Sequence, residues 1–426
     1  MAERINARRY LWVVVVIMAL LVSMVGVTAL AQTDEGDVFT GCVNEASGVL
    51  GNVAVGLDPA KPCNPQESQI TWDRAGPAFE ERIAALEEQV AELEEPYGTL
   101  ELTVDCAAGG TVGAALAEAQ THPGPVNITI SGVCEENVGI NRDDVSLSGL
   151  VRSDGIRAAS AASTVHVNEA RNVRFENMTI SGGTAGIEAW GSSFTADHVT
   201  VRDTTIWGIW GTGSTLGINN SSIVDNSGFG VTARGGFISI RSSSLSGNGT
   251  GLNSEDGGTI EGFDLTVTSN RVGVVAIRGG GLSLSGSSIE DNTDWGVAEW
   301  HAGSVRVGGD SRIANNGKTG VLVAFNSVFN VGGTVIENNG YEGINANGSS
   351  TVEVGADVMI RYNASGGITL RDSSYGSGVN GQAQIIDNGG WGINCAGPAT
   401  VKEAQNGFNM SSIVFSGNTD GDTNCP

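Results

Sequence analysis

The sequence predicts an all-β fold: a right-handed parallel β-helix, a solenoid of about 23 residues per coil, with an N-terminal helical cap and a preceding short coiled-coil helix. A motif recurs at this period through most of the chain. Inside each repeat apolar residues alternate with polar ones, and Gly, Ser, Thr and Asn separate the alternating stretches. A fixed period in the twenties indicates a solenoid, and a two-residue alternation indicates strands.

Residues 1–31 have the pattern of an export signal peptide. Arg4, Arg8 and Arg9 precede an apolar run from Leu11 to Val27, and Ala29-Leu30-Ala31 matches a cleavage site. The alternative is an uncleaved membrane anchor, because the run is near the shortest length that spans a bilayer. The sequence thus predicts a secreted or cell-surface protein.

Residues 32–76 form a small cysteine-containing module. Its frame, G-C-V-N at 41–44, a second cysteine at Cys63 and I-T-W at 70–72, resembles a module near the start of many exported bacterial proteins. That resemblance implies a bacterial envelope or secreted protein and no particular chemistry.

Residues 77–96 predict a short coiled-coil helix that ends at Pro96. Its a/d seam has heptad spacing and consists of Phe79, Ile83, Leu86, Val90 and Leu93. The segment 79–93 could form a homotrimer, or a single helix could lie on the neighbouring domain.

Residues 97–426 contain the repeat. Each unit has an apolar residue, two further residues and Asn, followed after a few residues by Gly and an aliphatic residue. We expect the aliphatic residues to face the interior and the Asn side chains to stack as a structural ladder at one turn. The ladder positions are Asn226, Asn248, Asn270, Asn292, Asn316, Asn339, Asn363 and Asn388.

The six cysteines lie in three groups along the chain, which favours three local disulfides among the 15 possible connectivities. The pairs are Cys42 with Cys63, Cys106 with Cys134, and Cys395 with Cys425. The stretch 111–120 predicts the amphipathic helix that would cap the first coil, with the second pair beside it.

On this repeat, residues 98–426 resemble the right-handed β-helix domains of the pectin-lyase-like superfamily, which include lyases, hydrolases, epimerases and adhesins. The catalytic signatures of its polygalacturonase-like and pectate-lyase-like members are incomplete here. There is no G-H-G, the N-T-D at 292–294 falls on a ladder Asn, and E-W-H at 299–301 does not match W-I-D-H. No catalytic residue is therefore assigned, and whether the protein is an enzyme stays open.

The net charge of −25 excludes several partners. Binding of nucleic acid or anionic membranes needs clustered Lys and Arg, so we expect neither, including no membrane contact after signal cleavage. Acidic polysaccharides would need bridging calcium, for which no motif is visible. No metal site and no cofactor are expected.

Stacking the coils in register brings one candidate ligand-binding face together. Its residues are His166, Glu188, Trp190, Trp207, Trp210 and Arg234. Flat aromatic rings can stack on sugar faces while the polar groups bind hydroxyls. Alternatively, the aromatic residues only cover the turns.

A secondary candidate comprises Trp295, Glu299, Trp300 and His301. Glu299 falls at an inward position, and because a bare buried carboxylate is costly, we expect a local bulge to turn it outward. Here too the aromatic residues could simply shield the turn.

Taken together, these features predict an exported β-helix protein for extracellular recognition, most plausibly of carbohydrate or polysaccharide. One alternative is a polysaccharide lyase or glycoside hydrolase of the same fold. The other is a structural or adhesive surface stalk, favoured if the coiled coil trimerises.

Overall fold

The computed structural model describes residues 38–44, 50–73, 98–378, 382–397, 400–401 and 412–425, in two compact units, 1–95 and 96–426. The predicted signal peptide and the predicted coiled coil, with its possible trimer, lie outside these residues. No described helix is both long and apolar enough to cross a membrane.

The first unit is a three-stranded antiparallel sheet in the order β2-β1-β3. Its strands are β1 (Val38–Asn44), β2 (Leu50–Val55) and β3 (Glu67–Asp73). The buried Cys42 of β1 forms a disulfide with Cys63. The first of the three predicted local disulfides is therefore present.

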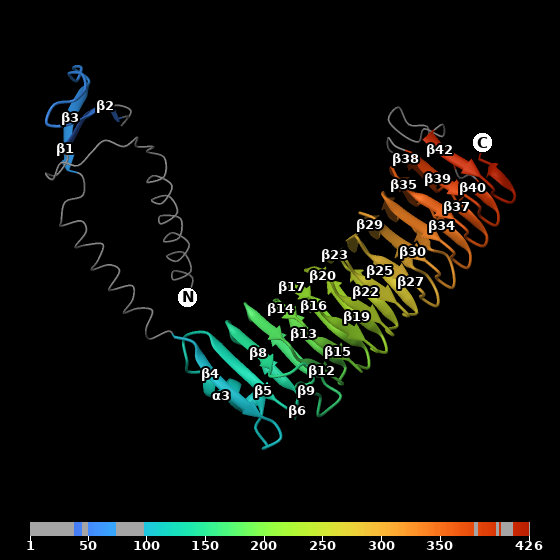
Figure 1. The fold of residues 1–426 in the computed structure, drawn as a ribbon, viewed down its shortest axis with the longest axis horizontal. Helices are drawn as coiled ribbons and strands as arrows, with labels where there is room; N and C mark the ends of the chain where they lie inside the picture. The colour runs from blue at the N-terminus through green and yellow to red at the C-terminus, as the bar shows by residue number, and fades with distance from the viewer. Residues whose placement is uncertain are drawn as a thin grey trace. The chain divides into compact units, whose positions relative to one another are not determined.

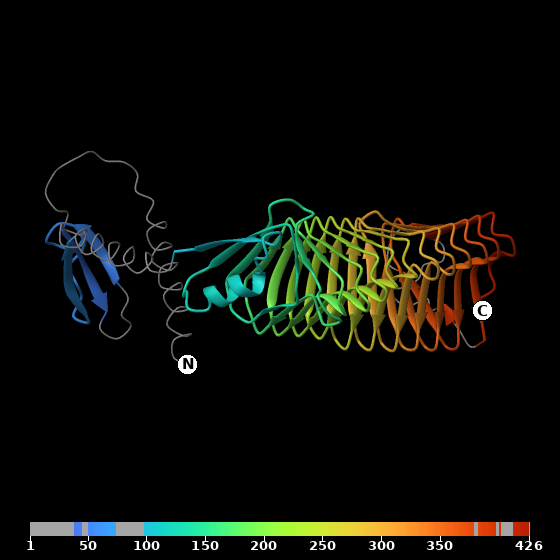
Figure 2. The same ribbon diagram turned by 90° about the horizontal axis from the view of Figure 1, so that it is seen from below.

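The second unit is a parallel β-solenoid built from three sheets that run side by side along its axis (Figure 1). Sheet 1 has 14 strands, and sheets 2 and 3 have 13 each. Each coil passes through sheet 3, then sheet 1, then sheet 2, so neighbouring strands in a sheet come from successive coils (Figure 2). The predicted β-solenoid is confirmed.

Sheet 1 contains β4 (Leu100–Asp105), β5 (Val126–Ser131), β8 (Val145–Gly149), β11 (Val173–Glu176), β14 (Ser193–Asp197), β17 (Thr215–Asn219), β20 (Phe237–Arg241), β23 (Thr259–Phe263), β26 (Gly281–Ser285), β29 (Ser304–Gly308), β32 (Val328–Val331), β35 (Thr351–Val354), β38 (Tyr375–Gly378) and β41 (Thr400–Val401).

Sheet 2 contains β6 (Val133–Glu135), β9 (Gly155–Arg157), β12 (Thr179–Ser181), β15 (Thr200–Arg202), β18 (Ser222–Val224), β21 (Ser244–Ser246), β24 (Thr266–Thr268), β27 (Ser288–Glu290), β30 (Ser311–Ala314), β33 (Thr334–Glu337), β36 (Met359–Arg361), β39 (Ala383–Ile386) and β42 (Ile413–Ser416).

Sheet 3 contains β7 (Val138–Ile140), β10 (Val165–Asn168), β13 (Ala185–Trp190), β16 (Trp207–Thr212), β19 (Phe229–Arg234), β22 (Thr250–Glu255), β25 (Val272–Ile277), β28 (Val297–Trp300), β31 (Val321–Ala324), β34 (Glu342–Asn347), β37 (Gly366–Arg371), β40 (Trp391–Ala396) and β43 (Gly421–Thr423).

The interior of the solenoid is a stack of aliphatic side chains. In sheet 2, for example, Ile223 pairs in register with Leu245, and Leu245 pairs with Val267; all three are fully buried. Every coil contributes such residues, and each buried aliphatic side chain stabilises the fold by about 1.5–3 kcal/mol. The sheets need no large central residue, because each core position packs on its counterpart in the next coil.

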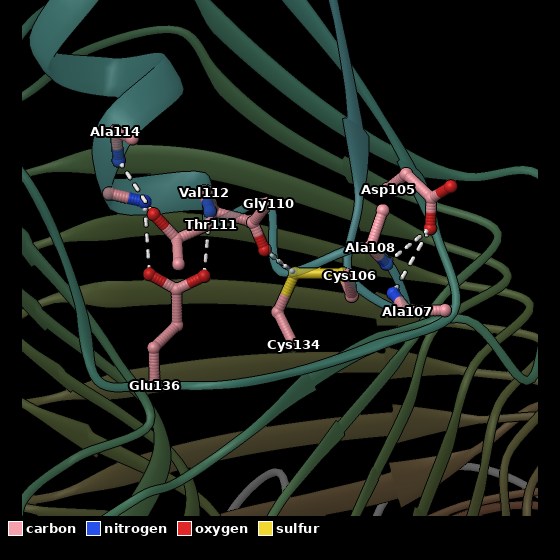
Figure 3. The surroundings of a disulfide bond; sticks show 11 residues. Asp105, Cys106, Ala107, Ala108, Gly110, Thr111, Val112, Ala114, Cys134 and Glu136 are labelled. Carbon is pink, nitrogen blue, oxygen red and sulfur yellow. Dashed lines mark hydrogen bonds between the residues drawn. A yellow bond between two sulfur atoms is a disulfide. The ribbon is translucent and has the colours of Figure 1, made fainter.

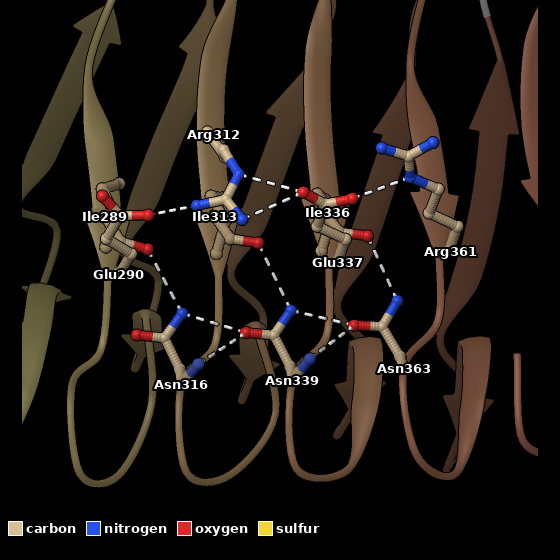
Figure 4. A network of polar contacts seen from close by, with 10 residues as sticks. All are labelled: Ile289, Glu290, Arg312, Ile313, Asn316, Ile336, Glu337, Asn339, Arg361 and Asn363. Atoms are coloured by element: carbon tan, nitrogen blue, oxygen red, sulfur yellow. Dashed lines mark hydrogen bonds and ion pairs between the residues drawn. The ribbon is translucent and has the colours of Figure 1, made fainter.

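The turn between sheets 2 and 3 carries a ladder of buried asparagines. The Nδ2 of Asn316 donates to Oδ1 of Asn339 at 2.9 Å, and the Nδ2 of Asn339 donates to Oδ1 of Asn363 at 2.9 Å (Figure 4). The same bond joins each neighbouring pair from Asn226 to Asn418. The spacing grows from 22 residues at Asn226 to 25 at Asn363, and the ladder is continuous because the additional residues lie outside this turn.

At the first coil, helix α3 (Val112–Ala119) packs its buried face, which includes Val112 and Leu116, against the start of the solenoid. The carboxylate of Glu136 accepts hydrogen bonds from the backbone N–H groups of Val112 and Gly113 at 2.6 and 2.9 Å (Figure 3). These two donors would otherwise lack partners at the helix N-terminus.

The remaining two predicted disulfides lie near the two ends of the solenoid. Cys106 is bonded to Cys134 beside the start of α3 (Figure 3). Cys395 of β40 is bonded to Cys425, which follows the last strand. All three local pairs favoured by the cysteine spacing are present, and no cysteine of the described residues is free.

Candidate functional site

The outer face of sheet 3 near the start of the solenoid collects the residues of the first candidate face. His166 pairs in register with Glu188, and Glu188 pairs with Trp210. Strand neighbours point to the same side of a sheet, about 4.8 Å apart. The register that the repeat predicts for these three residues is the register of the structure. We call His166, Glu188, Trp190, Trp207, Trp210 and Arg234 the tryptophan face.

Three tryptophans pack against one another on this face. The rings of Trp207 and Trp210 are stacked, with centroids 4.3 Å apart and an angle of 20° between the planes. Trp190 meets the ring of Trp210 edge-on at 6.2 Å and that of His166 at 6.0 Å. Trp190 nevertheless remains 46% exposed, so its ring is available to a ligand.

The carboxylate of Glu188 is held by its neighbours within the face. Trp190 donates from Nε1 to one carboxylate oxygen at 2.9 Å, and the Ser163 hydroxyl donates to the other. These bonds fix the orientation of both Glu188 and the exposed indole. Ser163 was missed by the sequence analysis because it lies in the preceding turn, outside the stacked columns.

Arg234 lies at the edge of the tryptophan face, where it is partnered. It is the register neighbour of Thr212, but its Nε donates to Asp256 at 2.9 Å. Asp256 also accepts from Arg278 at 2.6 Å, and that hydrogen bond is the main reason why the pKa of Asp256 lies below its usual value. Arg234 therefore does not present a free positive charge.

Buried polar atoms without a hydrogen-bond partner are concentrated in sheet 3. Within the described part of the chain, these atoms are His166 Nε2, Trp210 Nε1, the hydroxyls of Thr212 and Thr232, and both carboxyl oxygens of Glu299. The first four belong to the outer columns of β10, β16 and β19. Buried polar groups in proteins are nearly always paired, so this cluster calls for an explanation.

In the structure, the four residues of the second candidate set do not lie together. Trp295 and Trp300 meet edge-on at 5.8 Å on the outer side of sheet 3, and Lys318 lies over the Trp295 ring at 4.4 Å. They pack on a small apolar cluster formed by Val272, Val275 and Ala298. His301, by contrast, is exposed and stacks on Phe325 at 5.2 Å.

The expectation that a bulge turns Glu299 outward is wrong. Strand β28 keeps its register, with Glu299 opposite Ala276 on one side and Val323 on the other, and its side chain is fully buried in the interior. Burial raises the pKa of Glu299 well above its usual value, and the nearby backbone of Val305, which acts to lower the pKa, does not offset this. A raised pKa favours the neutral carboxyl group, whose burial costs less than that of a charged one.

A polar cleft on the outer face of sheet 1 was not expected from the sequence. It has a volume of about 490 Å³ and crosses the first strands of the solenoid. Its ionisable lining residues are Glu101, Asp144, Arg174 and Glu176. Glu101, Asp144 and the Arg174–Glu176 pair of β11 come from three different coils, so only the three-dimensional stack brings them together.

In the described ranges, no group of three or more His, Cys, Asp and Glu residues lies close enough to hold a metal ion.

Comparison with known proteins bears on the fold. No protein-family model and no curated protein sequence matches this chain. Among solved structures, the A-module of mannuronan C-5 epimerase AlgE6 from Azotobacter vinelandii is similar, with a TM-score of 0.55 and 17% identity over 76% of this chain and 100% of the module. PfbA, a surface adhesin of Streptococcus pneumoniae, gives a TM-score of 0.37 and 10% identity over 72% of this chain and 94% of the adhesin.

At such low identity the likeness is one of architecture. The epimerase module and this chain share the parallel β-helix, and the module matches over its full length. The protein thus has a right-handed parallel β-helix fold, as the repeat pattern predicted.

Proposed function

We propose that this protein is exported and recognises carbohydrate outside the cytoplasm, with the tryptophan face as a binding surface. The observation that carries the proposal is the coexistence of exposed aromatic surface and unpartnered polar atoms. Trp190 offers an open ring, while His166 Nε2 and Trp210 Nε1 beside it are buried without partners. Sugars present apolar ring faces together with hydroxyls, and such a surface suits both.

Two further features support an extracellular carbohydrate ligand. The three disulfides favour an oxidising, exported compartment, in keeping with the signal peptide proposed for residues 1–31. The epimerase that shares the fold is named for a polysaccharide, mannuronan. We carry over only the general ligand class, polysaccharide, as part of the proposal, and not the epimerase chemistry.

A polysaccharide lyase or hydrolase is the second candidate function, and the cleft on sheet 1 favours it. Glu101, Asp144 and Glu176 line that cleft, and paired carboxyl groups supply the acid and base in glycoside hydrolysis. A structural or adhesive stalk would depend on trimerisation through 79–93 and is tested by the mass of the intact protein in solution.

The first experiment is native electrophoresis through gels cast with neutral or acidic polysaccharides. Retardation of the wild-type chain that is lost in Trp190→Ala and Trp210→Ala supports recognition at the tryptophan face. Tyr362→Ala is the control, since Tyr362 is also aromatic and 49% exposed but follows strand β36 of sheet 2. Unchanged mobility in every gel refutes the binding proposal, and a cleared zone in the gel favours the enzyme.

A further inference from the structure

One face of the three-stranded sheet in the first unit is apolar and open. Its large side chains are between 41% and 66% exposed and belong to Leu50, Val53, Val55 and Ile70. We propose that this apolar face, formed by these four residues and Gly41, is the docking site for the apolar seam of residues 79–93 of the same chain. The inference does not depend on the proposed carbohydrate recognition.

The register of the strands gathers the apolar side chains on one side of the sheet. Leu50 of β2 pairs with Val43 of β1. Ile70 of β3 pairs with Gly41, two residues earlier on β1 and therefore on the same side. A Cβ atom at Gly41 would meet Cδ1 of Leu50 at 3.0 Å and Cγ2 of Val53 at 3.2 Å. The side chains thus form one patch around Gly41, and such exposed apolar patches are typical of interaction surfaces.

The opposite face of the same sheet is already covered. Thr40 and Cys42 of β1 point to that side and are fully buried. The Thr40 hydroxyl donates to the carbonyl oxygen of Gly56 at 2.6 Å, and Cys42 is bonded to Cys63. The loop after β2 therefore packs on the polar side of the sheet. Within the described part of the chain, the apolar side has no such cover.

The position and length of the seam fit this face. Strand β3 ends at Asp73 and the seam begins at Phe79, so the five residues 74–78 connect them. Five extended residues reach up to about 17 Å. A helix of residues 79–93 would be roughly 22 Å long. Strands β1 and β3 have seven residues each, or roughly 23 Å. The seam can therefore run along the whole face directly after the chain leaves β3.

The seam has the complementary requirement. It lies outside the described residues, and its predicted apolar positions are Phe79, Ile83, Leu86, Val90 and Leu93. A helix of this length is marginal in water by itself. An apolar helix stripe and an apolar sheet face are both stabilised when they are buried against another element. Packing the one on the other buries both within a single chain.

Charge favours this sheet over further copies of the seam as the partner. Residues 77–96 contain seven glutamates and one arginine. A trimer would bring three such segments together in a chain whose net charge is already −25, and like charges repel. The apolar face has no charged side chain at its described positions. Docking there buries the seam without bringing further acidic groups together.

Hydrogen exchange of the full chain, read by peptide mass spectrometry, tests the docking. We expect the amides of residues 79–93 to be protected in the wild type. Val53→Asp places a charge in the centre of the face and should speed their exchange roughly tenfold or more, while the amides of β1 stay protected. Val53→Thr, which keeps the branched shape suited to a strand, makes the same test if Val53→Asp unfolds the sheet. The control is Val414→Thr, since Val414 is also 49% exposed but belongs to β42 of the solenoid.

Sedimentation equilibrium of the same samples supplies the mass, which we expect to be that of one chain. Exchange of 79–93 at the rate of an unfolded peptide in the wild type overturns the proposal. Protection that persists in both Val53 variants also overturns it, and a mass of three chains then assigns the seam to a trimer. Protection that is lost in the variants while the wild type has the mass of several chains assigns the docking to a second copy and overturns the intramolecular form.

Discussion

Buried polar groups are hydrogen-bonded to one another along the asparagine ladder, whereas several on the outer face of sheet 3 have no partner. Along the ladder each side-chain amide is bonded to the next coil, and its Nδ2 also donates to a backbone carbonyl, as Asn316 does to Ile289 at 3.2 Å. In sheet 3, His166, Trp210 and two threonines hold buried polar atoms without partners. The ladder contributes cohesion between coils, whereas the sheet 3 face keeps unused hydrogen-bonding capacity.

The difference teaches how a repeat protein can combine rigidity with recognition. An Asn that recurs at the same turn of successive coils forms its hydrogen bonds with the equivalent Asn of the neighbouring coils. Residues that occur once, such as His166 and Trp210, have no copy to pair with and can bind something else. Four changes would break or sharpen this contrast.

The largest effect is expected from Asn316→Ala, which interrupts the ladder. Without this side chain the backbone N–H of Asn292 loses its acceptor and the carbonyl of Ile289 loses the Nδ2 donor, while the side-chain amide of Asn292 keeps only its bond to Val267. Each unsatisfied buried group costs about 1–3 kcal/mol, so we expect a loss of about 4 kcal/mol in the free energy of unfolding. Urea unfolding would measure it. The control is Asn330→Ala on the half-buried outer side of sheet 1, and equal losses in both variants would contradict the role assigned to the ladder.

The second-largest effect is an increase in the free energy of unfolding. Glu299→Met replaces an unpartnered buried carboxyl by an apolar side chain of similar size, and we expect a gain of about 2 kcal/mol near neutral pH. Because the folded pKa of Glu299 is raised, its favourable contribution is complete below the unfolded pKa and is lost as pH rises through the folded value. The gap between variant and wild type should therefore widen from pH 4 to pH 8 in thermal unfolding. The control is Glu353→Gln, at a half-buried carboxyl group of β35 on the outer side of sheet 1. A gap that is constant with pH, or no larger than that of the control, would show that the buried carboxyl is not the cause.

A smaller effect is expected at the ion network in sheet 2, where Glu337 binds both Arg312 and Arg361 (Figure 4). Burial raises the pKa of Glu337, but the hydrogen bonds from Arg361 and Arg312 outweigh it and leave the pKa lowered. The stabilisation is therefore present above the unfolded pKa and is lost as pH falls through the folded value. Glu337→Gln should lose about 1 kcal/mol at pH 7 and little in acid, measured by urea unfolding at both pH values. A loss that persists in acid would point to packing and not to charge.

The smallest effect on the free energy of unfolding is expected from Trp190→Ala, although this change should strongly weaken polysaccharide binding. Trp190→Ala removes a ring that is 46% exposed, so the free energy of unfolding should change by roughly 0.5 kcal/mol. The measurement is a urea unfolding curve beside the electrophoresis with polysaccharide. A loss of several kcal/mol would make Trp190 a packing residue and remove the contrast with the ladder.

Much of the fold could be predicted because the same local pattern is repeated. The two-residue alternation of apolar and polar residues identified strands, and the period of the asparagines identified coils. The column of His166, Glu188 and Trp210 followed from the same register; its role in binding stays a proposal. The pattern could not place Ser163, which bonds Glu188 from a turn, or the lining of the sheet 1 cleft, because these residues do not recur.

The sequence by itself determined the solenoid, the local disulfides and the alternation of inward and outward residues, since each depends on short-range pattern and on stacking of equivalent positions. Only the tertiary structure decided that Glu299 lies in the interior and that the residues of the sheet 1 cleft lie together. Whether a carboxyl group leaves the interior or stays there depends on the packing of both neighbouring strands. The sheet 1 cleft likewise depends on side chains from several coils, which no single repeat contains.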